Sequence, residues 1–121
     1  MKKIRVDIYG QDIYIFNGMD DLNRWVKRNP VHHEEDFGDF HGAAGFAGVM
    51  VMEDGTGRFF MCINDADIIT VCHESTHLAY QILHAVGVEH SVDNHEALAY
   101  LQHYIFGESA KKLGLILEQE A

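Results

Sequence analysis

The sequence predicts an α+β domain in which a small mixed or antiparallel sheet, built from two hairpins, packs against two helices. Three observations favour this class. Apolar and polar residues alternate near the N-terminus, two apolar runs flank a glycine-containing turn, and two later segments repeat apolar residues with a helical period. Because 121 residues suit one domain, we expect residues 1–121 to form a single unit.

The first predicted hairpin lies at the N-terminus. Residues 4–9 alternate between apolar and polar side chains, residues 10–11 suit a tight turn, and residues 12–16 return as a second strand. Residues 19–28 then predict a short helix, because their apolar residues fall on one face. The apolar residues of that face are Leu22, Trp25 and Val26.

Residues 29–45 contain Pro30 and predict a loop, which is either a flap over a site or an exposed linker. A second hairpin follows this loop. Residues 46–53 and 58–63 are apolar runs, and residues 54–57 form the turn between them.

Two helices are predicted in the second half of the chain. The first spans about 68–86 and stops at Gly87, and the second spans about 95–106 and stops at Gly107. Residues 109–117 add at most a short further helix. The inward stripe of the first helix is predicted to be Val71, Ser75, Leu78, Ala79, Ile82 and Val86.

Composition excludes several classes of protein. Lys and Arg total 9 against 19 Asp and Glu, and the net charge of −10 repels phosphate backbones, so we expect no nucleic-acid partner. No apolar stretch approaches the roughly 20 residues of a membrane span or forms a signal-peptide core, which predicts a cytoplasmic protein without membrane contact. Cys62 and Cys72 are too few for a disulfide framework.

The residues with the clearest chemistry are His73, Glu74 and His77, which match the pattern H-E-x-x-H. Residues i and i+4 of a helix lie above one another, so both imidazoles can reach one ion. Zn²⁺ accepts neutral imidazole and favours four ligands. Glu74 is rotated about 100° from His73, from where its carboxylate can reach a water on the metal.

A catalytic zinc site needs a third protein ligand, for which Glu96 is the leading candidate. Residues 87–94 form a turn that returns the second helix toward the first, with Glu96 near its start. Glu96, Tyr100 and His103 share one polar stripe of that helix. The alternatives for the third ligand are His95, His90 and Asp93.

This combination resembles the zincin metallopeptidases, whose active-site helix carries H-E-x-x-H after apolar strands. Glu96 on a following helix is similar to the glutamate-ligand branch, the gluzincins, and the chain as a whole resembles short zincin-like proteins encoded by tailed phages. The resemblance implies that His73, His77 and Glu96 bind one Zn²⁺, and that Glu74 is the general base and proton shuttle.

The resemblance also implies that one strand of the second hairpin forms a sheet edge, to which a peptide adds as an extra strand. The chain departs from large gluzincins, because it is too short for their second lobe. Tyr100 stands where thermolysin-like enzymes keep an acidic residue, so Tyr100 and His103 are candidates for stabilising an oxyanion.

The expected function is therefore a zinc-dependent hydrolase, a peptidase acting on a peptide or protein with metal-activated water. The alternative is a non-catalytic zinc-binding interaction or inhibitor protein on the same scaffold. A metal-free acidic interaction protein is a further alternative, although the acidic residues are scattered rather than arrayed.

Overall fold

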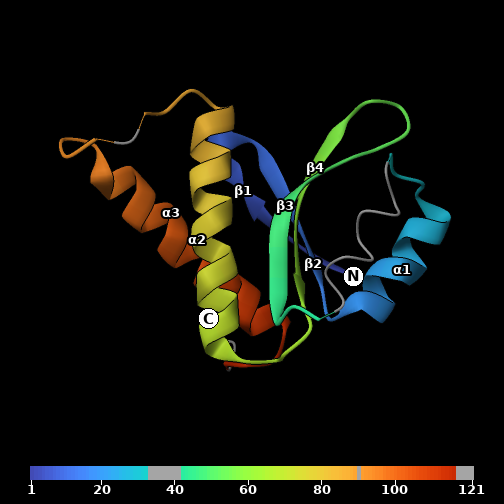
Figure 1. The fold of residues 1–121 in the computed structure, drawn as a ribbon. Helices are drawn as coiled ribbons and strands as arrows, with labels where there is room; N and C mark the ends of the chain where they lie inside the picture. The colour runs from blue at the N-terminus through green and yellow to red at the C-terminus, as the bar shows by residue number, and fades with distance from the viewer. Residues whose placement is uncertain (33–41, 90, 117–121) are drawn as a thin grey trace.

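A computed structural model describes residues 1–32, 42–89 and 91–116. A four-stranded sheet lies between one helix on one face and two helices on the other (Figure 1). The elements are β1 (Lys2–Val6), the 3-10 turn η1 (Asp7–Tyr9), β2 (Gln11–Phe16), α1 (Met19–Arg28), β3 (Gly45–Val51), β4 (Gly57–Ile63), α2 (Ile68–Ala85) and α3 (His95–Lys112). The predicted α+β class is confirmed.

The sheet is mixed, with strand order β1-β2-β4-β3. Each hairpin is antiparallel, and β2 pairs with β4 in parallel, which joins the two hairpins into one sheet. β3 lies at one edge, so the expectation that a strand of the second hairpin forms a sheet edge is confirmed. No helix of the described residues has the length and apolar character to cross a membrane.

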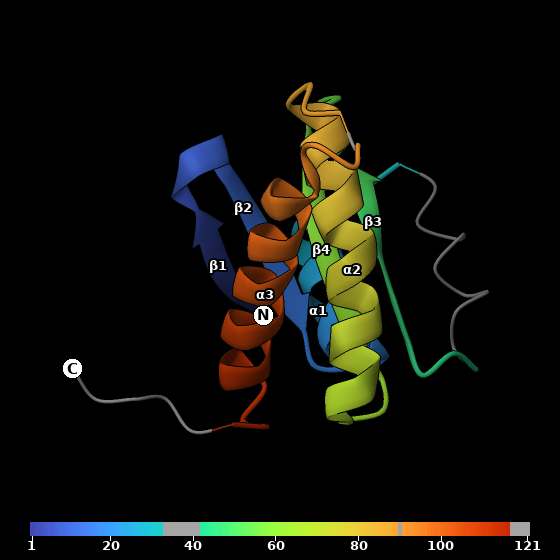
Figure 2. The same ribbon diagram turned by 90° about the vertical axis from the view of Figure 1, so that its left-hand side faces the viewer.

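Side-chain alternation in the strands divides the core into two layers. In β4, Phe59, Met61 and Ile63 face the layer formed with α2 and α3, whereas Phe60 and Cys62 face the layer formed with α1. Helices α2 and α3 therefore share one face of the sheet, and α1 covers the other (Figure 2).

Most predicted boundaries of the helices and of the second hairpin are confirmed. Helix α1 spans the predicted residues, and α2 begins as predicted and ends one residue earlier. Asp67 caps α2 by accepting a hydrogen bond from the Ile69 backbone N–H at 2.8 Å. Val86 of the predicted inward stripe is half-buried, whereas Glu74 joins the buried residues of α2.

Two predicted boundaries are wrong. The first strand ends at Val6, because η1 replaces its last residues and leaves the Ile8 side chain 82% exposed. Helix α3 does not stop at Gly107 but continues to Lys112. The reason is tertiary packing, since Ser109 and Ala110 in the continued turns are buried, and this burial outweighs the poor helix propensity of one glycine.

Candidate metal centre

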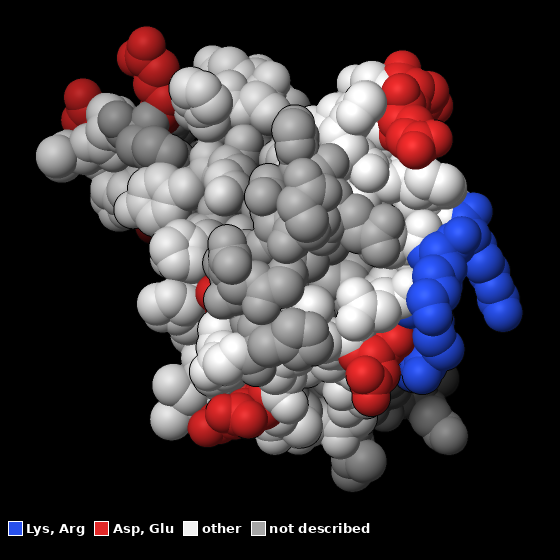
Figure 3. Space-filling model, turned by 45° about the vertical axis from the view of Figure 1, so that its right-hand side comes forward, with Lys and Arg blue, Asp and Glu red and all other residues white. Residues whose placement is uncertain are grey.

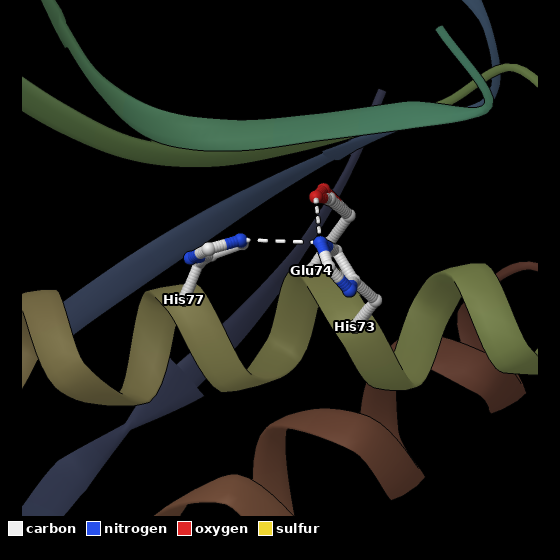
Figure 4. Close-up of side chains that lie close together, drawn as sticks. All are labelled: His73, Glu74 and His77. Carbon is white, nitrogen blue, oxygen red and sulfur yellow. Dashed lines mark hydrogen bonds and ion pairs between the residues drawn. The ribbon is translucent and has the colours of Figure 1, made fainter.

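Helix α2 brings His73, Glu74 and His77 together, as the i, i+4 spacing predicts. The Nε2 atoms of the two histidines are 3.2 Å apart, and their rings meet edge to face with centroids 4.8 Å apart. Figure 4 shows both rings converging on one point on the side of α2 that faces β3. Both imidazoles are exposed to solvent.

The separation of the two Nε2 atoms fits a shared cation. Tetrahedral coordination with Zn–N bonds of 2.0–2.1 Å places two ligand nitrogens about 3.3–3.4 Å apart. The observed 3.2 Å needs almost no adjustment to reach this value. With a hydrogen on one of the two Nε2 atoms, the same separation also suits a hydrogen bond between the rings.

Glu74 lies beside the pair but is buried, with 4% of the residue exposed. Its Oε1 is 3.9 Å from His73 Nε2, and its carboxylate points toward β3 (Figure 4). Its Oε2 is buried and has no hydrogen-bond partner within the described residues. Burial raises the pKa of Glu74 above its ordinary 4.5, and the neighbouring His73 and His77 act in the opposite direction.

Small residues in β3 let α2 approach the sheet beside this group. A Cβ on Gly45 would meet Thr70 Cγ2 of α2 at 2.8 Å and the Cys62 carbonyl oxygen at 3.1 Å. Ala47, two residues on, packs in the core layer shared with α2. The sequence analysis missed this role of β3, although small residues within an apolar strand are a readable sign of a close approach.

The structure does not bring Glu96 to the histidine pair. Within the described residues, His73, Glu74 and His77 form the group of three side chains suited to a metal ion, and Glu96 is not among them. Glu96 is exposed on α3, and its Oε1 lies 3.7 Å from Nδ1 of the adjacent His95. Figure 4 shows α3 on the side of α2 away from the imidazoles.

The placement of α3 explains this separation. The turn after α2 returns the chain as predicted, but Leu101 and Ile105 of α3 are buried against the core layer that contains α2. Their burial turns the polar stripe of α3 to solvent. Of the alternative third ligands, His95 and Asp93 are exposed, and His90 lies outside the described residues.

Tyr100 and His103 also lie apart from the histidine pair. Tyr100 is 73% exposed and lines a groove of about 610 Å³ between η1 and α3. Tyr104, on the same groove, donates a hydrogen bond from its hydroxyl to the Arg5 carbonyl oxygen at 2.6 Å. His103 is exposed on α3 and is not part of the His73–Glu74–His77 group.

Charge on the surface does not form a continuous acidic array on the face shown in Figure 3. Acidic side chains lie there in separate groups, and Lys and Arg gather along one edge. A mimic of nucleic-acid charge needs a regular acidic array. This face does not provide one.

Comparison with known proteins adds no assignment, because no family model, curated protein or solved structure matches this chain. The interpretation of the site therefore depends on the geometry of α2 and β3. Two convergent imidazoles, one buried carboxylate and an adjacent sheet edge are the features to explain.

Proposed function

We propose that this chain is a zinc-dependent hydrolase, and specifically a peptidase, with the metal held by His73 and His77, the two histidine ligands that the described residues bring together. The observation that carries this proposal is the 3.2 Å separation of the two Nε2 atoms, which matches two ligands of one tetrahedral ion. Neutral imidazole is also the ligand type that zinc accepts.

Glu74 is suited to the proton transfers of hydrolysis. When bound, zinc lowers the pKa of a coordinated water to about 7 and polarises a carbonyl group. The Glu74 carboxylate would take one proton from the water that attacks the amide carbonyl and would return it to the leaving nitrogen as the C–N bond breaks. Its Oε1 lies 3.9 Å from His73 Nε2 and is the carboxylate oxygen placed to take this proton.

The two sheet edges differ in a way that supports a peptide substrate. The edge strand β1 carries Lys2, Lys3 and Arg5, the charges that commonly protect an edge from pairing. The edge strand β3 is seven residues long and carries no charge, and at its C-terminal end the Val51 carbonyl oxygen already accepts a hydrogen bond from the His32 backbone N–H at 2.8 Å. An extended peptide added to the N-terminal part of β3, where Gly45 approaches Thr70 of α2, would present its backbone carbonyls to the histidine pair.

Metal analysis and hydrolysis of casein-derived peptides test this proposal together. Wild-type protein should carry one zinc, and His77→Ala should lose most of it. His84→Ala is the matched control, because His84 is an exposed histidine of the same helix, about 10 Å further along its axis. It should keep both zinc and activity.

Glu74→Gln separates metal binding from catalysis. We expect this variant to keep its zinc and to lose hydrolysis by about 10²–10⁴-fold, the usual contribution of a general base. Retained hydrolysis in Glu74→Gln would overturn the role of Glu74. Zinc binding by the wild type without any hydrolysis would overturn the peptidase and favour the non-catalytic zinc-binding alternative.

A further inference from the structure

We propose that the groove between η1 and α3 is a second binding site, which takes an organic cation with an apolar body and a trialkylammonium head. Three tyrosines and one aspartate are among the residues that line it, and its volume is about 610 Å³. Pockets for small molecules usually have volumes of about 300–1,000 Å³, so the groove has room for such a ligand. It shares no residue with the His73–Glu74–His77 group on α2.

Aromatic side chains from both elements line the groove. Tyr100 and Tyr104 lie one turn apart on α3 and therefore share one face of that helix, and Tyr9 comes from η1. The Tyr104 hydroxyl bonds to the Arg5 carbonyl oxygen, which holds this ring in place. Tyr100 is 73% exposed, so its ring can contact a ligand without leaving the core. Faces of tyrosine rings attract cations, and quaternary ammonium groups in particular.

Acidic side chains accompany these rings. Asp7 lines the groove, and its side chain is 93% exposed. On α3, Glu96 lies one turn before Tyr100, and Glu108 lies one turn after Tyr104. Burial raises the pKa of Tyr104, and the negative charges of Glu108 and Asp7 raise it further, which shows that both carboxylates act on this ring.

Nearby basic side chains neutralise only part of this negative charge. Nε of Arg5 lies 3.4 Å from Oδ1 of Asp7, but its Nη1 lies 3.2 Å from Oδ1 of Asp12, so one cation serves two carboxylates. Nζ of Lys111 lies 3.3 Å from Oε1 of Glu108. The carboxylates around the groove therefore outnumber the cations, and the remaining charge favours a cationic ligand.

A second copy of this chain is a poorer occupant of the groove. A two-fold symmetric interface places the same surface of both copies in contact. Each copy has a net charge of −10, and the carboxylates beside the tyrosines would face one another across such an interface. Charge complementarity therefore points to a cation rather than to self-association.

Two fluorescent probes of the same shape test the preference for charge. One is the dansyl amide of aminoethyl-trimethylammonium, and the other carries a neutral tert-butyl group in place of the trimethylammonium head. Fluorescence titrations of the wild-type protein should show about ten-fold tighter binding of the cationic probe, the size expected from one or two cation–π contacts. Equal affinities, or no binding of the cationic probe, would overturn the proposal.

Substitutions of Tyr100 assign the preference to the aromatic wall. Tyr100→Leu keeps an apolar side chain without a ring and should reduce the preference about five-fold, whereas Tyr100→Phe should keep most of it. Tyr80→Leu is the matched control, because Tyr80 is an exposed tyrosine of α2 that does not line the groove. An unchanged preference in Tyr100→Leu would overturn the aromatic site, and so would a wild-type dimer that Tyr100→Leu dissociates in analytical ultracentrifugation.

Asp7→Asn tests the charge beside the rings. It should weaken binding of the cationic probe about two-fold, as expected for one exposed ion pair, and leave the neutral probe unaffected. Glu53→Gln is the matched control, because Glu53 is an exposed acid outside the groove. Equal weakening of both probes by Asp7→Asn would contradict an electrostatic role for this residue.

His77→Ala distinguishes this proposal from the peptidase. The variant should lose zinc and activity but bind the cationic probe like the wild type, since the groove and the metal group share no residue. Failure of the peptidase therefore leaves this site standing. Loss of probe binding in His77→Ala, in protein with an unchanged circular dichroism spectrum, would place the probe at the metal centre and overturn the second site.

Discussion

At the scale of single residues, Glu74 joins the chemistry of the site to the stability of the protein. Its carboxylate is buried beside two imidazoles, and one of its oxygens has no hydrogen-bond partner within the described residues. A buried, unpaired acceptor costs about 1–3 kcal/mol. The metal-free protein therefore keeps a destabilising group in place, as expected for a residue retained for reactivity.

The raised pKa of Glu74 gives a pH-dependent prediction for metal-free protein kept in chelator. Protonated Glu74 contributes stability that is present below its ordinary pKa of 4.5 and is lost as the pH rises through its raised value in the folded state. Glu74→Gln cannot lose a proton. At pH 7 this variant should therefore melt a few degrees above the wild type.

Thermal unfolding followed by circular dichroism between pH 4 and 8 measures this difference. It should shrink toward zero as the pH falls below 4.5, where the wild-type carboxyl is protonated in both the folded and the unfolded state. Glu96→Gln is the control, because its carboxylate is 69% exposed, and it should melt like the wild type throughout. Identical melting of Glu74→Gln and wild type at every pH would contradict the burial of this carboxylate.

At the scale of elements, the contact between β3 and α2 fixes where the histidines stand relative to the sheet edge. The sequence predicted both elements, because a β hairpin and a helical period are local patterns. It did not predict their closeness, which depends on the missing side chain of Gly45. Such a contact joins residues that are far apart in the chain, so it produces no periodic pattern of apolar residues in the sequence.

Gly45→Ala tests this contact. The added Cβ would stand 2.8 Å from Thr70 Cγ2 and 3.1 Å from the Cys62 carbonyl oxygen of β4, so either the Thr70 side chain or the contact between α2 and β3 must shift. We expect a loss of about 1–3 kcal/mol in the free energy of unfolding, together with weaker zinc binding. Urea denaturation and a competitive zinc titration measure the two effects.

Gly48→Ala is the matched control in the same strand. Its Cβ would have Phe60 Cε1 at 4.0 Å as its nearest neighbour, which is ordinary contact. We expect the free energy of unfolding to change by less than about 0.5 kcal/mol. An equal loss of unfolding free energy in both variants would show that a Cβ at either glycine of β3 is destabilising. The close contact between Gly45 and Thr70 would then not explain the loss in Gly45→Ala.

The continuation of α3 through Gly107 gives a second prediction about an element. A Cβ on Gly107 would meet no atom within 4 Å, and the residue lies inside the helix. Gly107→Ala should therefore stabilise the protein by about 1 kcal/mol through helix propensity alone. Urea denaturation measures this change, and a destabilised variant would place the end of the helix at Gly107 after all.

At the scale of the whole molecule, the layers decide which predicted residues meet. The mixed sheet arises because β2 and β4 pair in parallel, a long-range choice that no local pattern contains. The motif on α2 was predictable because its members lie one turn apart. The position of Glu96 relative to the histidines was not predictable in this way. It depends on how α3 packs against α2, which is determined by the burial of Leu101 and Ile105.

Because His73, Glu74 and His77 lie on α2, which packs with α3 in one layer of the core, zinc binding should stabilise the entire fold. A ligand that binds only the folded state adds about 4 kcal/mol when its concentration is 1,000 times its Kd. Wild-type protein should therefore melt several degrees higher with saturating zinc than with chelator. His77→Ala should lose this difference, and His84→Ala should keep it. Differential scanning calorimetry measures all three, and superimposable wild-type transitions with and without zinc would mean that His73 and His77 do not hold the ion.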